Sequence, residues 1–250
     1  MKSELGLDST VQKGSDTLYT LLLRLSAPLQ SWGSGSFYDR RETDYMPTKS
    51  GIIGMLAAAL GRKRNESLDD LAELNFGVRI DLPGTKLDDF HITRMGEKLN
   101  TNLSSRAYLN DAIFLVGLEW EDSGFLQMLE NALRQPKFCI FLGRKSCPPT
   151  LPLVLGIREG SLESALREEE WLVPKWRKKS LFRFTQEIPL RIVMESLTGN
   201  AVKKDVPVSF SPMGREYRFR RMKEVSPKIV TNGCVSVTAL TEHDPMTGLK

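Results

Sequence analysis

The segment Pro47-Thr48-Lys49-Ser50-Gly51 joins a predicted helix start to a lysine and two hydroxyl groups. The first N–H groups of a helix have no intrahelical partners and lie at the positive end of its dipole, which suits them to a phosphate. The segment is not a P-loop, because the GxxxxGK[ST] spacing is absent. The alternative is that Thr48 only caps the helix and Lys49 is a solvated side chain.

Aromatic residues, glycines and basic side chains alternate in the sequence just before this helix start. Gln30, Trp32 and Tyr45 stand in the same stretch of sequence as Arg40 and Arg41. Proteins that bind single-stranded nucleic acid stack unpaired bases on aromatic rings and pair basic residues with the backbone. The sequence therefore predicts an RNA contact here, and the alternative is a tryptophan packed under its own loop.

Two further groups of basic residues are candidates for the same surface. One is the turn Leu142-Gly143-Arg144-Lys145-Ser146-Cys147, which we expect to follow a strand directly. The other lies in the polar stretch 83–111 and contains Arg94, Lys98 and Arg106. Because single-strand binding uses several phosphate contacts, we predict that these residues and Lys49 line one groove. The alternative is that both groups are ordinary solvated loops.

Residues suited to catalysis are few. RNA cleavage without metal requires one group to take the 2′-hydroxyl proton and another to protonate the leaving 5′ oxygen. The candidates are His91, Tyr45, Lys49 and His243. No sequence spacing brings them together, and no hydrolase, metalloprotease or dinucleotide-binding motif is present. The three cysteines form no CxxC pair with histidines nearby. We therefore predict a protein that is not an enzyme, with no catalytic residue, metal or cofactor.

Composition sets the broad class. The chain has 250 residues, 40% of them hydrophobic and 26% charged, with a formal net charge of +4. These values are typical of a globular protein, and the mild basic excess is compatible with an RNA partner. No apolar run approaches the ~20 residues that span a bilayer, and scattered thiols without a signal peptide are typical of a reducing compartment. The sequence predicts a cytoplasmic protein without membrane association.

Hydrophobic periodicity predicts the elements that must position these residues. Residues 1–16 are polar and aperiodic, and we expect a disordered leader there. The pattern then predicts strands at 18–25, 76–81, 112–120 and 138–142 and helices at 48–60, 67–75 and 123–134. With a protruding hairpin at 83–111, this order matches an α+β, ferredoxin-like domain over 17–157 with helices on one face.

The remainder of the chain is less regular. A helix is predicted at 162–170 and short strands at 187–194, 215–221 and 235–240. In the third of these elements Tyr217 and Phe219 alternate with charged residues, as in a half-exposed strand. We expect residues 158–250 to form a smaller C-terminal region of mixed type.

Several segments together resemble the CasD family, the subtype I-E branch of the CRISPR-associated Cas-five proteins. They are Leu23-Arg24-Leu25-Ser26-Ala27-Pro28-Leu29-Gln30-Ser31-Trp32-Gly33, Pro47-Thr48-Lys49-Ser50-Gly51-Ile52-Ile53-Gly54, Leu142-Gly143-Arg144-Lys145-Ser146-Cys147-Pro148 and Arg106-Ala107-Tyr108-Leu109-Asn110-Asp111-Ala112. The resemblance is good over residues 18–157 and looser beyond them.

This resemblance implies a ferredoxin-like (RAMP) domain with a protruding thumb that holds the 5′ handle of crRNA in the Cascade complex of antiviral defence. It implies contacts with an adjacent backbone subunit and the large subunit, with target DNA met only through the complex. RNA processing then falls to a separate subunit. Two alternatives stay open: a metal-independent endoribonuclease that processes CRISPR repeat RNA, as in subtype I-C relatives, and a purely structural assembly protein whose basic residues meet acidic partners.

Overall fold

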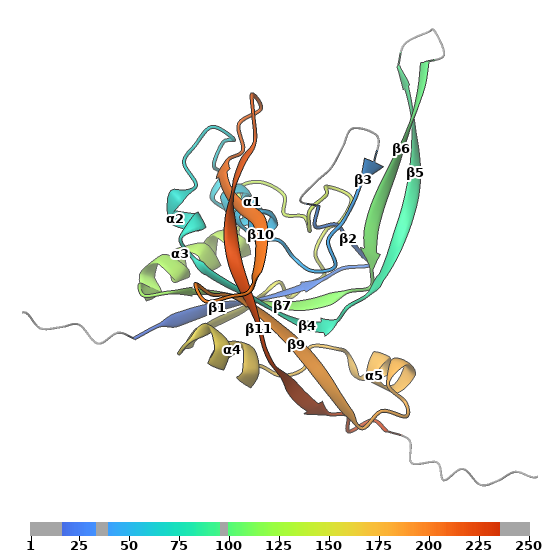
Figure 1. The fold of residues 1–250 in the computed structure, drawn as a ribbon, viewed down its shortest axis with the longest axis vertical. Coiled ribbons are helices and arrows are strands. Elements are labelled where there is room, and N and C mark those ends of the chain that lie inside the picture. The colour runs from blue at the N-terminus through green and yellow to red at the C-terminus, as the bar shows by residue number, and fades with distance from the viewer. Residues whose placement is uncertain (1–16, 34–39, 96–99, 236–250) are drawn as a thin grey trace, which may run out of the picture.

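The structure is a computed structural model that describes residues 17–33, 40–95 and 100–235 (Figure 1). Its larger sheet is antiparallel, with seven strands in the order β10-β11-β9-β4-β7-β1-β8. These strands are β1 (Tyr19–Ser26), β4 (Asn75–Leu82), β7 (Ile113–Trp120), β8 (Val154–Glu159), β9 (Glu187–Glu195), β10 (Ala201–Ser209) and β11 (Glu216–Thr231). The smaller sheet contains β2 (Leu29–Gln30), β3 (Arg40–Arg41), β5 (Thr85–Met95) and β6 (Asn100–Asn110).

Five helices are described: α1 (Lys49–Leu60), α2 (Asp69–Ala72), α3 (Ser123–Arg134), α4 (Leu162–Glu168) and α5 (Lys175–Leu181). The succession β1-α1-β4-β7-α3-β8, with the spatial order β4-β7-β1-β8, is the ferredoxin-like arrangement predicted from the sequence. The predicted bounds of α3 and the predicted end of α1 are confirmed, and α1 begins one residue later than predicted. Thr48 caps α1, and Gly61 ends it in a left-handed conformation with φ 79°.

Both faces of the larger sheet are covered, because both faces of its central strands are apolar. Phe114 and Val116 of β7 belong to the main core together with residues of α1 and α3, whereas Leu115 packs with α4. Figure 1 shows α1 and α3 on one side of the sheet and α4 and α5 on the other. The prediction of helices on one face holds for the ferredoxin-like core, and α4 and α5 add a second layer.

The strand predicted at 138–142 is wrong, and the fourth strand of the core is β8. The N–H groups of Lys137 and Phe138 donate to the carbonyls of Ala59 and Ala58 at the end of α1, so they are not available to a neighbouring strand. The basic turn therefore lies within the connection from α3 to β8 and does not directly follow a strand.

The predicted hairpin is present as β5 and β6, which pair from Thr85 opposite Asn110 to Met95 opposite Asn100. Figure 1 shows it projecting beyond the body of the protein. The sequence pattern predicted no buried core residues in the hairpin, but Ala107, Tyr108 and Leu109 are buried. These residues anchor the base of the hairpin, where β2 and β3 also pair with β6.

The C-terminal strands continue the larger sheet, because β9 pairs with β4. The predicted strand at 187–194 is present, and that at 215–221 is the beginning of the longer β11. Residue 157 lies inside β8, so the larger sheet runs without a break across the boundary predicted between residues 17–157 and 158–250. The leader at 1–16 and the strand predicted at 235–240, apart from Val235, lie outside the described residues. Among the described residues, no helix has the length and apolar character needed to cross a membrane.

Candidate nucleic-acid interface

The base of the hairpin brings together arginines from three segments that are distant in sequence. Arg41 of β3 lies opposite Arg106 of β6, and the Arg144 guanidinium lies over the Tyr108 ring, 4.6 Å from its centroid. One Nη atom of Arg144 also donates to the Arg41 carbonyl at 2.9 Å. We call Arg41, Arg106 and Arg144 the arginine cluster.

Two donors of the arginine cluster have no acceptor. Nε of Arg106 and Nη1 of Arg144 are both buried and make no hydrogen bond with the described residues. A buried donor left unpaired costs about 1–3 kcal/mol, and hydrogen bonds between a charged donor and an anionic acceptor are about twice as strong as neutral ones. The arrangement is therefore suited to a phosphate or to an acceptor on a base.

The basic turn is fixed to the body by its backbone. Ser31 N–H donates to the Leu142 carbonyl at 3.1 Å, and Cys147 N–H donates to the Arg144 carbonyl at 2.8 Å. Gly143 has φ 87°, and a Cβ added there would lie 1.5 Å from the Ser31 carbonyl oxygen. Only glycine fits this approach, so Gly143 sets the position from which Arg144 reaches the hairpin. Lys145 beside it is exposed.

Gln30 and Trp32 occupy the core and not the surface that was predicted for them. The Trp32 side chain is 1% exposed, and its indole N–H donates to the Gln30 side-chain oxygen at 3.1 Å. Gln30 in turn donates to the Ala112 carbonyl at 2.7 Å. A Cβ added to Gly51 would lie 2.9 Å from the Trp32 ring, so the ring packs directly on α1. No base can stack on this ring, and the packing alternative replaces the stacking prediction.

The helix start at Thr48 does bind an anion, but the protein supplies it. Lys49 N–H donates to the Asp205 carboxylate at 3.0 Å, and Lys49 Nζ lies 2.7 Å from Glu195. The same Asp205 carboxylate accepts two hydrogen bonds from Arg220, at 2.6 and 3.0 Å. We call Lys49, Glu195, Asp205 and Arg220 the helix-start ion network.

Burial removes Lys49 from the predicted groove. Lys49 is 3% exposed. Burial lowers the pKa of its ammonium group, and the nearby Glu195 carboxylate opposes this shift. Thr48 acts as the N-cap, accepting from Gly51 N–H at 3.2 Å, and the Ser50 hydroxyl lies 3.4 Å from the Thr48 hydroxyl. In the described conformation an internal carboxylate therefore occupies the anion position at Lys49, and RNA contact by Ser50 or Gly51 stays a prediction.

The remaining predicted contacts are distributed along the hairpin and beside it. Tyr45 is 73% exposed and is available for contact. Arg94 lies in β5, but its side chain is outside what the structure describes, as is Lys98 altogether. Lys86 forms an ion pair with Glu42 at 2.9 Å. Hydrogen bonds from Lys86 and from Arg40 lower the pKa of the Glu42 carboxyl group.

The opposite face of the hairpin carries exposed apolar residues beside the charged Asp88 and Arg40. Phe90, Ile92 and Leu103 are exposed there, and Phe90 lies opposite Ser105, which is also paired with Arg40. Several of these residues line an open groove of about 420 Å³. The hairpin thus has the arginine cluster on one face at its base and exposed apolar side chains on the other face. Sequence reasoning missed both Tyr108, hidden in a polar stretch, and this apolar face.

The groups considered for RNA cleavage are not assembled in the described residues. His91 Nε2 lies 2.5 Å from Asp89 on the hairpin, whereas Lys49 pairs with Glu195 at the end of β9. His243 lies outside the described residues. Within the described ranges no three His, Cys, Asp or Glu side chains form a set that could hold a metal ion.

Known proteins match this chain over most of its length. A family model described as CRISPR-associated protein (Cas_Cas5) matches residues 20–223. CRISPR system Cascade subunit CasD of Escherichia coli (strain K12) is 37% identical, with the match covering 56% of this chain and 72% of that protein.

Two solved structures have the same fold. A chain of a CRISPR RNA-guided surveillance complex is 32% identical, with a TM-score of 0.70 over 86% of this chain and 92% of that chain. A crystal structure of a Cas protein is 36% identical, with a TM-score of 0.64 over 86% of this chain and 97% of the other. Since the family model spans far more than half of its residues, this chain belongs to the Cas5 family of CRISPR-associated proteins.

Proposed function

We propose that this chain is the subunit of a type I-E Cascade complex that holds the 5′ handle of crRNA, and that the arginine cluster contacts the RNA. The observation that carries the proposal is the pair of buried donors without acceptors, Arg106 Nε and Arg144 Nη1, at the base of the hairpin. The chain's membership of the Cas5 family and its likeness to a Cascade subunit support RNA as the ligand.

The same proposal gives the apolar face of the hairpin to a protein partner. Exposed apolar residues that lie together on a projecting element are typical of an interaction surface. Phe90, Ile92 and Leu103 meet this description. In a complex built on crRNA, the adjacent backbone subunit is the partner that this face suits, with the large subunit as a second neighbour.

The chain has no catalytic role in this proposal. An acid and a base within hydrogen-bond reach of one phosphate are required for metal-independent cleavage. His91 lies on the hairpin beside Asp89 and Lys49 is committed to Glu195, so neither is paired with another candidate in the described residues. The endoribonuclease alternative is therefore not favoured.

The test measures RNA affinity as a function of salt. Purified full-length protein is titrated with fluorescent handle RNA at several salt concentrations, after the RNA that co-purifies with the complete complex has been sequenced. Arg106→Ala and Arg144→Ala should each lower the slope of log affinity against log salt by about 0.7. Lys63→Ala, which removes an exposed charge elsewhere, should leave the slope unchanged. Lys49→Ala should lower stability without changing the slope.

Two results would contradict the proposal. Unchanged slopes in both arginine variants would remove the arginine cluster from the RNA site. Specific scission of repeat RNA by the purified chain in EDTA, abolished by His91→Ala, would replace the binding role with an endoribonuclease.

A further inference from the structure

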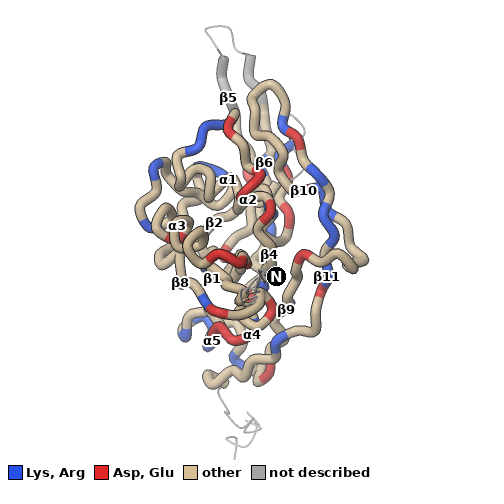
Figure 2. Tube along the Cα trace, turned by 90° about the vertical axis from the view of Figure 1, so that its left-hand side faces the viewer, with Lys and Arg blue, Asp and Glu red and all other residues tan. Residues whose placement is uncertain are grey.

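A second basic surface lies on α5, which Arg177 attaches to Asp111 just after β6. Residues 171–186 contain five Lys or Arg and no Asp or Glu. The helix buries none of its own residues, and two aromatic side chains stand out from it: Trp176 is 67% exposed and Phe184 just after it is 79% exposed. Figure 2 shows the concentration of Lys and Arg at α5.

Part of this segment is used to attach α5 to the body. Trp171 is buried, contacts Phe182 edge to face at 5.3 Å and donates its indole N–H to the Asp81 carbonyl at 3.1 Å. Arg177 donates to the Asp111 carbonyl at 2.9 Å, and Lys178 Nζ lies 4.4 Å from the centre of the Trp171 ring. Two of the five cations are thus committed to the fold.

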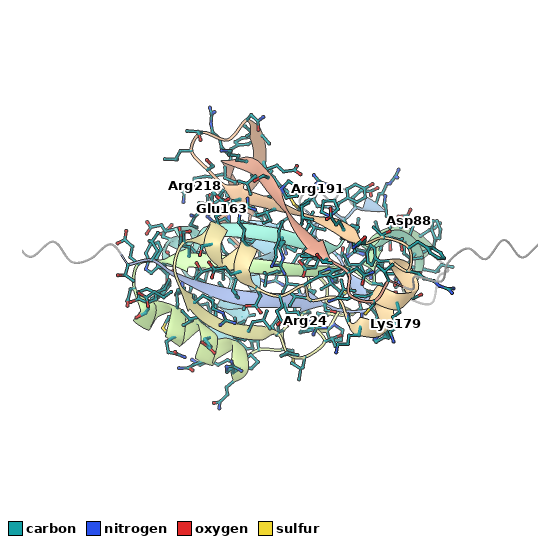
Figure 3. All side chains as sticks on the ribbon, turned by 90° about the horizontal axis from the view of Figure 1, so that it is seen from below. Arg24, Asp88, Glu163, Lys179, Arg191 and Arg218 are labelled. Atoms are coloured by element: carbon teal, nitrogen blue, oxygen red, sulfur yellow. The ribbon has the colours of Figure 1, made fainter. Side chains whose placement is uncertain are left out.

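The other three cations have no such commitment. Lys175, Lys179 and Arg183 are exposed, and within the described residues none of them pairs with a carboxylate. Lys175 and Lys179 are four residues apart, so they share a face of the helix. Trp176 is adjacent to this face, and the Arg183 guanidinium lies 5.4 Å from the Phe184 ring centre. Lys179 is labelled in Figure 3, which looks onto the face of the sheet covered by α4 and α5.

The combination of residues favours one class of ligand. Lysine is depleted in protein–protein interfaces, whereas single-stranded nucleic acid pairs lysines with phosphates and aromatic rings with bases. A helix that lies on a membrane surface has separate apolar and basic faces, but in α5 the basic side chains and the aromatic side chains are interleaved. The surface also lies across the seven-stranded sheet from α1, on the side opposite the arginine cluster (Figure 1).

We propose that Lys175, Trp176, Lys179, Arg183 and Phe184, the α5 surface, form a second site that binds single-stranded nucleic acid. The lysines contact the phosphate backbone, and the two aromatic rings stack on bases. The site is independent of the arginine cluster and does not require that the handle be bound there.

The test uses the full chain with Arg106→Ala and Arg144→Ala already introduced, so that binding at the arginine cluster is removed. Fluorescent single strands of DNA and of RNA, without the handle sequence, are titrated separately, and these two arms identify which nucleic acid the site takes. Trp176→Ala should weaken binding by about 5- to 150-fold if one base stacks on it. Lys175→Ala with Lys179→Ala should lower the salt slope by about 1.4.

The matched control removes two charges from another exposed position, as Lys63→Ala with Arg64→Ala. Because α5 buries none of its own residues, the variants should retain the circular dichroism spectrum and unfolding midpoint of the parent. No measurable binding by the parent, equal losses in the control, or unchanged binding in the α5 variants would each overturn the proposal. Loss of a Cascade protein subunit from α5 variants whose nucleic-acid affinity is unchanged would also overturn it, in favour of a protein interface.

Discussion

The helix-start ion network and the arginine cluster both contain buried basic groups but differ in what balances their charge. In the network, Lys49 meets Glu195 and Arg220 meets Asp205, so each cation has an internal carboxylate. In the cluster, Arg144 meets a carbonyl and an aromatic ring, and within the described residues neither it nor Arg106 pairs with a carboxylate.

This difference separates a structural charge from an available one. A buried cation with its own carboxylate joins distant segments, here α1 with β9, β10 and β11, and has no capacity left for a ligand. A buried guanidinium donor without an acceptor carries a cost that a ligand can relieve. The partner of a basic residue therefore indicates its role better than its charge or its place at a helix start.

Removing the central carboxylate of the network should give the largest effect. Asp205→Ala leaves Arg220 buried without its partner and the Lys49 N–H without its acceptor, and it should lower the free energy of unfolding by about 3–5 kcal/mol. Urea denaturation measures this loss. Glu224→Ala, which breaks the exposed pair with Arg191, is the matched control and should cost less than about 1 kcal/mol.

Asp205→Ala should leave RNA binding intact. The folded fraction should bind RNA with an unchanged salt slope, because no network residue contacts the ligand. An equal stability loss in Asp205→Ala and Glu224→Ala, or a changed salt slope, would mean that the two regions do not divide structure from binding in this way.

An intermediate effect is expected where the body positions the arginine cluster. Gly143→Ala places a Cβ against the Ser31 carbonyl and strains a backbone at φ 87°, so it should cost about 1–3 kcal/mol of stability. It should also weaken RNA binding about as much as Arg144→Ala, since the turn must move. Gly214→Ala, where an added Cβ meets nothing within 4 Å, is the control. Unaltered RNA affinity in Gly143→Ala would show that the turn need not be held in this position.

The sequence was sufficient for the fold wherever local signals agree. Helices α1 and α3 have caps and apolar periodicity at matching positions, and their observed bounds lie within one residue of the predicted ones. The strand predicted at 138–142 failed because its N–H groups bond to the end of α1, a tertiary contact that no local pattern reveals. α5 was not predicted, since its short basic sequence lacks an apolar stripe.

The candidate site was predictable only in part, because local sequence does not identify long-range partners. Arg106 and Arg144 lie together at the hairpin base, and RNA contact by them and by Lys145 stays a prediction. Lys49 was misassigned because its anion, Asp205, lies 156 residues further along the chain. Trp32 was misassigned for a related reason, since its packing against Gly51 depends on how the loop folds over α1.

The smallest expected effect concerns the thiol in the basic turn. Cys147 is buried, and burial raises the pKa of its thiol, whereas Cys139 a few residues earlier is exposed. Since the thiolate is the reactive form, iodoacetamide at pH 8 should alkylate Cys139 first and Cys147 only when the turn opens. Trypsin cleaves after Arg144 and so separates the two cysteines into different peptides for mass spectrometry. Gly143→Ala should speed the labelling of Cys147 alone, and bound handle RNA should slow it by bridging Arg144 to the hairpin. Equal labelling rates for the two cysteines in the wild type would instead show that the turn is not held by the body, and that the arginine cluster lacks the fixed geometry on which its binding role depends.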